Sequence, residues 1–329
     1  MRISKKISLL LVGTALHLGA TSVIQAATDC KAVKDISSAE CEALLKLYHS
    51  TNGANWKKNK GWNTTNKPCD WKGISCKDDS VIKISLKSNL LTGILPNFSA
   101  FSKLKKINLK SNQLTGTIPN FSSPKLEEIN LSANQLVGTI PNFSLPQLEE
   151  LQLSSNHLTG TIPNFSLPKL KELHLYNNQL IGIIPNFSLP KLKELHLHNN
   201  QLTGTIPNFN VLPKLEKLNL SSNHLTGTIP DLTALSDLET LNLYKNQLTG
   251  TIPNFNLPDL EALYLNANQL TGAIPNFTDL PKLEKLYLDS NQLTGAIPNF
   301  AALSDLEELY LYDNQLTGMA PDLSKSKKN

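Results

Sequence analysis

The sequence predicts an elongated solenoid in which about 11 short strands form one parallel β-sheet along the chain. Three observations support this fold class. One phrase recurs from Val81 onward, every copy opens with an LxxLxL pattern, and every copy holds one asparagine at a fixed place. The copies are 22 or 23 residues apart, a period typical of stacked repeats. Their aligned asparagines are Asn89, Asn112, Asn134, Asn156, Asn178, Asn200, Asn223, Asn246, Asn268, Asn291 and Asn314.

Each copy opens with a segment that has the alternation of a half-buried strand. The phrase is clearest in residues 170–191, LKELHLYNNQLIGIIPNFSLPK. Its fourth and sixth residues point to one side, and its third, fifth and seventh point to the other, because side chains alternate along a strand. One short strand cannot bury its own leucine row, whereas stacked coils share a continuous core. The leucines should therefore lie inside and the alternating residues outside.

The asparagine follows the strand, where the chain has to turn. Its amide can donate to and accept from backbone groups of neighbouring coils, which would otherwise be buried without partners. We interpret the asparagines as a structural ladder rather than a catalytic set. Most copies continue as LTGxIPNF, in which glycine permits a tight bend and proline fixes φ. This return path predicts extended or 3-10 chain rather than a long helix.

Nine of the ten phenylalanines lie two residues after that proline, at one place in each coil. A side chain that recurs once per coil can stack on its counterparts along the solenoid. We expect them to fill the side opposite the sheet and not to form a ligand surface. They are Phe98, Phe121, Phe143, Phe165, Phe187, Phe209, Phe255, Phe277 and Phe300.

The phrase LxxLxLxxNxLTGxIP resembles the plant-type class of the leucine-rich-repeat family, over roughly residues 81–321. The resemblance implies a right-handed solenoid of the α/β horseshoe class, mostly β and 3-10, with its parallel sheet on the concave side. Family repeats are usually about 24 residues long. The copies here omit one or two residues between IPNF and the next strand, so we expect a thinner convex side.

Residues 1–26 have the features of a secretory signal peptide. Arg2, Lys5 and Lys6 precede an apolar run from Ile7 to Ala20, and a small-residue exit follows near Ala26. An anchored helix is the alternative, but the run is interrupted and short for a bilayer. Removal of these three cations, with no acidic residue, lowers the formal net charge from +4 to about +1. We therefore predict no nucleic-acid partner.

Residues 27–80 predict a cap that covers the first coil. Ser37 and Glu40 are spaced as a capping box, apolar residues follow at helical spacing, and Asn52 and Gly53 end the helix. The segments EALLKLYHSTNGANW and CDWKGISC also resemble the N-terminal cap of plant-type repeats. We interpret the three tryptophans as the core of this cap rather than as sugar-stacking platforms. They are Trp56, Trp62 and Trp71.

All four cysteines lie within the cap segment. With an export signal, an even local cluster predicts two disulfides. Of the three pairings, we favour Cys30 with Cys41 and Cys69 with Cys76, because short loops close most readily. A zinc site is the competing interpretation, but the spacing lacks the paired short knuckles of such sites.

We expect no matching cap after the last repeat. Residues 322–329 are polar and cationic, and we predict that they are disordered. The last leucine row would then be open to a partner or to self-association. No segment after the signal peptide is apolar enough for an integral membrane segment. We expect a secreted protein, extracellular or at the cell surface, or periplasmic in a Gram-negative host.

Side chains at the outward strand positions do not pack in the core, so these residues can vary to serve a function. Six of the seven tyrosines lie there, and tyrosine offers a large contact area with a polar tip. The alternative is that aromatic residues simply favour strands and cross-strand pairs. The candidate ligand-binding residues are His174, Tyr176, His196, His198, Tyr244, Tyr264, Tyr287, Tyr310 and Tyr312.

Charge is also ordered along the predicted sheet. Four glutamates occupy the third position of successive strands, where like charges oppose folding by tenths of a kcal/mol per pair. A basic partner or a cation could relieve this repulsion. We favour a hydrated face with Lys171 and Lys193 nearby. The four are Glu128, Glu150, Glu172 and Glu194.

The histidines His174, His196 and His198 lie close enough together in the pattern to be tested as metal ligands. Three imidazoles within reach of one another can hold zinc. We favour ordinary surface histidines, and we predict neither a metal nor a cofactor.

Function is predicted to be recognition rather than catalysis. The sequence has no GxSxG, HExxH, GxxxxGK[ST] or kinase signature. The resemblance implies binding of a protein, peptide or glycan ligand outside the cell, although fold alone does not fix function. We therefore predict a secreted non-enzymatic recognition module that binds on its concave face. The alternatives are an inhibitor of a secreted enzyme and a structural or adhesive cell-surface protein.

Overall fold

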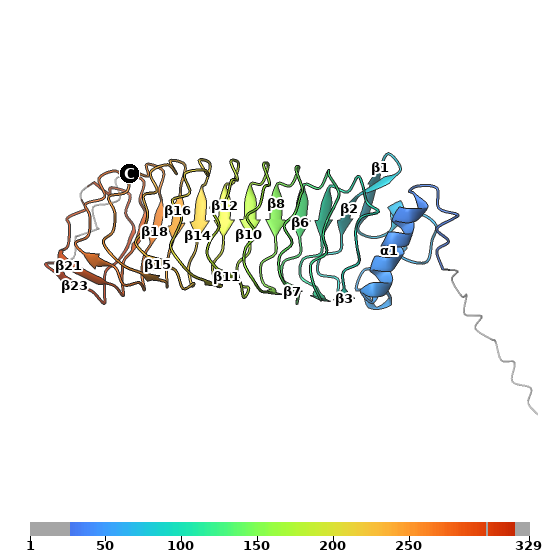
Figure 1. The fold of residues 1–329 in the computed structure, drawn as a ribbon, viewed down its shortest axis with the longest axis horizontal. Coiled ribbons are helices and arrows are strands. Elements are labelled where there is room, and N and C mark those ends of the chain that lie inside the picture. The colour runs from blue at the N-terminus through green and yellow to red at the C-terminus, as the bar shows by residue number, and fades with distance from the viewer. Residues whose placement is uncertain (1–26, 301, 320–329) are drawn as a thin grey trace, which may run out of the picture.

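The structure is a computed structural model that describes residues 27–300 and 302–319. Its coils stack side by side into an elongated body, with the α-helix of the described residues at the N-terminal end (Figure 1). The predicted signal peptide at residues 1–26 and the predicted tail at residues 322–329 lie outside the described residues.

The cap contains the helix α1 (Ser38–Ser50) and the 3-10 helices η1 (Gly53–Asn55) and η2 (Pro68–Asp70). The predicted capping box is confirmed, because the Glu40 backbone N–H donates to Ser37 Oγ at 3.2 Å and the Ser37 N–H donates to the Glu40 carboxylate at 3.4 Å. The other carboxylate oxygen of Glu40 accepts from the Val81 N–H at 3.1 Å. This bond joins the helix to the first coil.

Disulfides and tryptophans hold the cap together. The favoured pairing is confirmed: Cys30 is bonded to Cys41, and Cys69 to Cys76. The three tryptophans are buried, and the Trp62 ring packs 4.8 Å from that of Trp56 and 5.0 Å from that of Trp71. Their placement confirms that they form the core of the cap and not an exposed platform.

One long sheet of 12 strands runs the length of the described residues. Strand β1 (Ile74–Lys77) comes from the cap and pairs antiparallel with β2 (Ser80–Ser85). The others continue in parallel, as the repeats predicted: β4 (Lys106–Asn108), β6 (Glu128–Asn130), β8 (Glu150–Gln152), β10 (Glu172–His174), β12 (Glu194–His196), β14 (Lys217–Asn219), β16 (Thr240–Asn242), β18 (Ala262–Tyr264), β20 (Lys285–Tyr287) and β22 (Glu308–Tyr310).

The register of the parallel strands places equivalent residues side by side. Leu173 lies beside Leu195, and Leu195 beside Leu218. These leucines are fully buried, and those of the other coils join them in one core. The predicted inward leucine row is therefore confirmed, and the alternating residues of each strand face outward.

The asparagine ladder is also confirmed. Asn200, for example, is 7% exposed, and its amide nitrogen donates to the carbonyls of Leu197 at 3.0 Å and of Leu175, one coil earlier, at 3.1 Å. Its amide oxygen accepts from the Leu180 N–H at 3.0 Å. From Asn112 onward each such asparagine satisfies backbone groups of two coils, whereas Asn89 bonds to the backbone of Lys58 in the cap.

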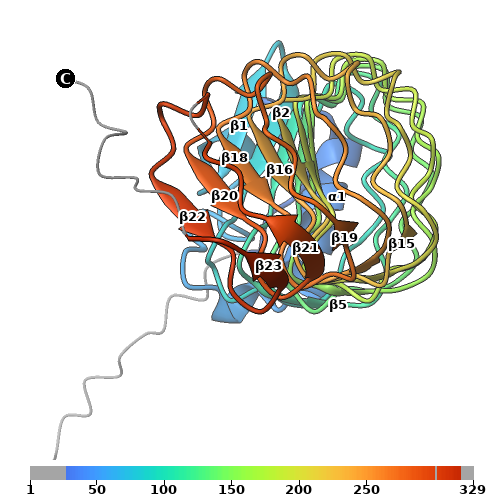
Figure 2. The ribbon, with the colours of Figure 1, turned by 90° about the vertical axis from the view of Figure 1, so that its left-hand side faces the viewer.

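The return path contains short strands that the sequence did not predict. They follow the ladder asparagines and pair in small parallel sheets at one corner of the coils (Figure 2). They are β3 (Thr92–Ile94), β5 (Gln113–Thr115), β7 (Val137–Gly138), β9 (His157–Leu158), β11 (Ile181–Gly182), β13 (Gln201–Leu202), β15 (Thr226–Gly227), β17 (Gln247–Leu248), β19 (Thr271–Gly272), β21 (Gln292–Ala296) and β23 (Gln315–Thr317).

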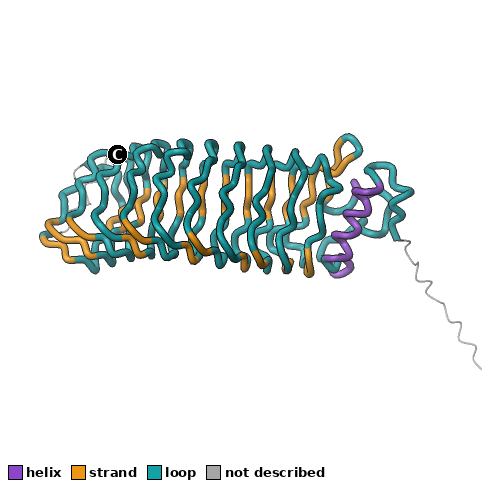
Figure 3. Tube along the Cα trace, in the orientation of Figure 1, coloured by secondary structure: helices purple, strands orange, loops and turns teal. Residues whose placement is uncertain are grey.

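The rest of each return path is loop and turn, as Figure 3 shows. The 3-10 helices of the described residues lie in the cap, and single turns such as that closed by the Leu170 N–H on the Leu167 carbonyl at 3.0 Å lead into the strands. The copies are too short between IPNF and the strand for a longer helix. The phenylalanines are buried on this side, and the rings of Phe143 and Phe165 stack 6.4 Å apart.

Candidate ligand-binding face

The outward side of the long sheet, which we call the sheet face, carries the predicted binding residues. All nine lie on or just after strands β10 to β22, and none belongs to the buried core. Eight of them gather in two groups. The histidine cluster is His174, Tyr176, His196 and His198. The tyrosine ladder is Tyr264, Tyr287, Tyr310 and Tyr312.

The histidine cluster is built by the register of two adjacent strands. His174 and His196 are partners in the pairing of β10 with β12, and their ring centroids are 4.6 Å apart in an edge-on arrangement. Two residues later, the rings of Tyr176 and His198 stack 4.4 Å apart and almost parallel. Four rings therefore form one continuous patch on two coils.

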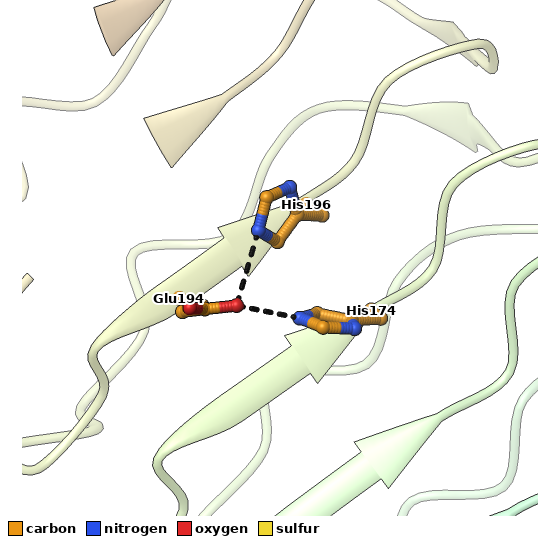
Figure 4. Close-up of side chains that lie close together, drawn as sticks. All are labelled: His174, Glu194 and His196. Atoms are coloured by element: carbon orange, nitrogen blue, oxygen red, sulfur yellow. Dashed lines mark hydrogen bonds and ion pairs between the residues drawn. The ribbon is translucent and has the colours of Figure 1, made fainter. Parts of the chain in front are cut away.

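A carboxylate joins this patch. Glu194 Oε2 lies 3.2 Å from His174 Nε2 and 3.4 Å from His196 Nε2, as Figure 4 shows. The other oxygen of Glu194, Oε1, accepts from Lys217 Nζ at 2.9 Å. Sequence reasoning placed Glu194 in the acidic row and did not associate it with the histidines. The alternation indicated only that Glu194 and the histidines share a face, because third and fifth positions point the same way.

Burial keeps two of these histidines neutral near pH 7. Desolvation, and then the neighbouring His174, lowers the pKa of His196 below its ordinary value. Desolvation lowers the pKa of His198 to about 4. The Nδ1 atom of His198 is buried and finds no hydrogen-bond partner among the described residues. Neutral imidazoles keep a lone pair available for a ligand or a metal ion.

The tyrosine ladder has the same origin in strand register. Tyr264, Tyr287 and Tyr310 are partners across β18, β20 and β22, with ring centroids 4.8 and 4.4 Å apart. Tyr310 is 41% exposed and Tyr312 59% exposed. Tyr264 and Tyr287 are half-buried, so the three in-register rings form a partly exposed stack that a ligand could contact.

Charged neighbours fix the central ring of the ladder. The Tyr287 hydroxyl donates to the Glu308 carboxylate, which also accepts from Lys285 Nζ at 2.8 Å. The hydrogen bond to Glu308, with burial, raises the pKa of Tyr287 above its usual range. The phenol therefore stays protonated at physiological pH and keeps its orientation.

The two groups are separated by a polar stretch. Tyr244, the ninth predicted residue, is 38% exposed and lies between them, and among the described residues no aromatic ring packs against it. Asn219 and Asn242 occupy the strand positions between His196 and Tyr264. The structure thus divides the predicted site into two aromatic groups and one isolated tyrosine.

The acidic row crosses β6, β8, β10 and β12, with its glutamates in register. Lys106 Nζ lies 3.2 Å from Glu128 at one end, and Lys217 pairs with Glu194 at the other. Lys171 and Lys193, which we expected beside the row, pair instead with Glu149 and Glu216. Adjacent residues on a strand point to opposite faces, so those two lysines cannot compensate the row.

Family comparisons agree with this architecture. A family model described as Leucine Rich repeats (2 copies) matches residues 146–189, 190–234 and 281–325, and one described as Leucine Rich Repeat matches residues 103–123, 125–144 and 237–256. A Leucine rich repeat N-terminal domain model matches residues 37–77. The chain belongs to the leucine-rich-repeat family. Its repeats and cap are of the plant type, with both disulfides in the cap.

Among curated proteins, this leucine-rich-repeat chain is 37% identical over 71 residues to a probable leucine-rich repeat receptor-like protein kinase of Arabidopsis thaliana. The match covers 21% of this chain and 10% of that protein. The chain thus spans a small part of the curated relative. Within the described residues, no helix is long and apolar enough to cross a membrane.

Similar solved structures include plant receptor ectodomains. The PEPR1–AtPEP1 complex matches with a TM-score of 0.71 and 31% identity, over 86% of this chain and 46% of that one. The ectodomain of the Arabidopsis receptor kinase HAESA, with an IDA peptide hormone, gives 0.70 and 32%, over 84% and 50%. A plant ice-binding protein gives 0.69 and 27%, over 87% and 97%. This chain spans about half the length of the receptor ectodomains.

Proposed function

We propose that this leucine-rich-repeat protein is a secreted, non-enzymatic recognition module that binds an extended peptide segment along its sheet face. The observation that carries the proposal is the in-register stack of Tyr264, Tyr287 and Tyr310 on an outward surface. The similarity to a receptor ectodomain in complex with a peptide hormone supports this class of ligand.

The aromatic residues are not required by the fold. Asn219 and Asn242 occupy the equivalent strand position in two neighbouring coils with the same pairing. Coils with asparagine and coils with tyrosine or histidine therefore share one backbone. Aromatic side chains at these positions add contact area for a partner, and tyrosines commonly contribute most to binding energy at interfaces.

The spacing of the two aromatic groups suits an extended ligand. Three strand-to-strand steps separate His196 from Tyr264. At about 4.8 Å per step, the separation is about 14 Å, which an extended segment of about four or five residues can span. The polar residues between the groups are Asn219 and Asn242. Their amides can donate hydrogen bonds to a peptide backbone and accept hydrogen bonds from it.

A triple variant tests the proposal. We would select peptides from a random display library against the wild-type protein and measure their affinity for Tyr264→Asn/Tyr287→Asn/Tyr310→Asn. Because asparagine is native at this position of other coils, the variant should keep its melting temperature while losing about tenfold or more in affinity.

The matched control substitutes exposed residues elsewhere in the coils, Thr205→Tyr and Thr228→Tyr, and should leave peptide affinity unchanged. Equal peptide binding by the triple variant, or no peptide enriched by the wild type, would contradict the proposal.

A second candidate function is adsorption to ice, which the threonines of the return path favour. Eight exposed threonines flank the glycines of four TGT segments, and we call them the threonine face. They are Thr159, Thr161, Thr203, Thr205, Thr226, Thr228, Thr249 and Thr251. The similar ice-binding protein, of which this chain covers 97%, supports the candidate.

Stacking orders the threonine face. A Cβ added to Gly227 would lie 2.9 Å from Thr205 Cγ2, so that methyl group fills the space above the glycine of the next coil. The same contact, at 2.8 Å, joins Thr228 to Gly250. The threonines of the three consecutive coils from Thr203 to Thr251 thus repeat at about 4.8 Å between coils, whereas Ile181 and Ile183 separate them from Thr159 and Thr161. A repeating array of this kind is a surface that a crystal could match.

Measurement of the freezing and melting points of a protein solution distinguishes ice adsorption from peptide recognition. If the threonine face adsorbs to ice, the wild type should lower the freezing point of a solution below its melting point, and Thr205→Tyr/Thr228→Tyr should abolish that gap. The triple tyrosine variant should retain it. An absence of any such gap in the wild type would remove this candidate.

A further inference from the structure

The carboxylate and two imidazoles of the histidine cluster lie close together, with Glu194 Oε2 near both rings. Their three nearest ligand atoms, His174 Nε2, Glu194 Oε2 and His196 Nε2, all lie within 4.8 Å of one another. Two of the separations, 3.2 and 3.4 Å, equal those expected between ligands of a tetrahedral zinc ion with bonds of about 2.0–2.1 Å. We propose that His174, Glu194 and His196 form a zinc site on the sheet face.

The strands hold these ligands in place before any ion binds. His174 and His196 are register partners on adjacent parallel strands, and Glu194 lies two residues before His196 on the same face of β12. All three side chains are mostly buried, with 17–24% of their surface exposed. Little ordering entropy remains to be lost when a metal binds.

A further residue orients the carboxylate. Lys217 Nζ binds Glu194 Oε1, which leaves Oε2 directed toward the two imidazoles. Outer partners of this kind orient metal ligands and strengthen their binding.

The surrounding charge also favours a cation. Glu172 is the register partner of Glu194, so two carboxylates face each other across β10 and β12. A dication at Glu194 would offset that repulsion. Three protein ligands leave the fourth position of zinc open.

Calorimetric titration of chelator-treated, untagged protein with Zn²⁺ tests this site. We expect one ion per chain in the wild type and about tenfold or greater loss of affinity in each of His174→Asn, His196→Asn and Glu194→Gln. Both histidine replacements use the residue that β14 and β16 carry at the same position, Asn219 and Asn242, which preserves the fold.

The control variants are His157→Asn and His224→Asn, exposed histidines that follow ladder asparagines outside the cluster. They should bind Zn²⁺ as the wild type does. With Co²⁺ as a probe, the wild type should give the visible absorption of a tetrahedral site, and His174→Asn/His196→Asn should not. Equal Zn²⁺ affinity in wild type and this double variant, or equal losses in the control variants, would overturn the proposal. Neither readout depends on a peptide ligand, so the zinc site can fail while peptide recognition stands.

Discussion

Individual residues of one type perform different tasks in this protein according to their place in the coil. Asn200 is buried, and its amide bonds to backbone groups of its own coil and the preceding one. Asn219 lies on the sheet face, where its amide oxygen accepts from the Ser221 N–H at 3.1 Å. Removal of the first leaves two buried carbonyls and a buried N–H without partners, whereas removal of the second leaves only groups of Ser221 without that partner.

Replacing a ladder asparagine should therefore destabilise the solenoid strongly. For Asn200→Ala we expect a loss of about 3 kcal/mol in the free energy of unfolding, because several buried backbone groups lose their partners. Urea denaturation followed by circular dichroism measures this loss. The exposed neighbour Gln201 provides the control, since Gln201→Ala should change stability by less than about 0.5 kcal/mol. Similar losses in both variants would contradict the structural role of the ladder.

Along the strands of the sheet, acidic side chains are only partly compensated by neighbouring lysines. The four glutamates in register repel one another, and among the described residues lysines form ion pairs with the row only at its two ends. Glu150, in the interior of the row, has a raised pKa because of burial and then because of Glu172 and Glu128. Glu149, one residue earlier, has a lowered pKa because Lys171 donates a hydrogen bond to it.

These two adjacent glutamates predict opposite effects of pH. A carboxyl group whose pKa is raised by folding binds its proton more tightly in the folded state, so stability falls as pH rises above the ordinary value of 4.5. Glu150→Gln should therefore increase stability at pH 7 by tenths of a kcal/mol, and the gain should vanish in acid. Melting temperatures of wild type and variant across pH measure the difference.

Glu149→Gln is the matched control with the opposite sign. Its lowered pKa means that it stabilises the folded state above pH 4.5, and that this contribution is lost as pH falls. The substitution should lower the melting temperature slightly at pH 7 and leave it unchanged in acid. A loss of stability from Glu150→Gln at pH 7 would contradict the repulsion within the row, and a gain from Glu149→Gln would contradict the stabilising pair with Lys171.

The whole molecule is a one-dimensional stack of coils. The residues that stabilise it are buried, and the residues that differ between coils lie on its surface. Leucines, phenylalanines and ladder asparagines are buried, so the sheet face and the threonine face can vary without loss of the core. The cap closes the first coil through α1, the tryptophans and the antiparallel strand β1. In the last described coil, Leu309, Leu311 and Leu316 are only partly buried.

Much of this architecture could be predicted from the sequence because it depends on short-range repetition. The period fixes which leucines lie inside, the capping box starts α1, and close spacing pairs Cys30 with Cys41 and Cys69 with Cys76. The small sheets of the return path were not predicted, since two-residue strands carry no recognisable alternation.

The arrangement of the candidate site could be predicted only in part from the sequence. By itself the sequence determined that tyrosines and histidines face outward, because alternation along a strand depends only on the position of each residue. The tertiary structure alone decided that they form two separate groups, that Lys217 holds Glu194, and that Glu194 meets both His174 and His196. Such contacts join side chains of different coils, and their geometry depends on strand register and side-chain direction, which no local pattern specifies.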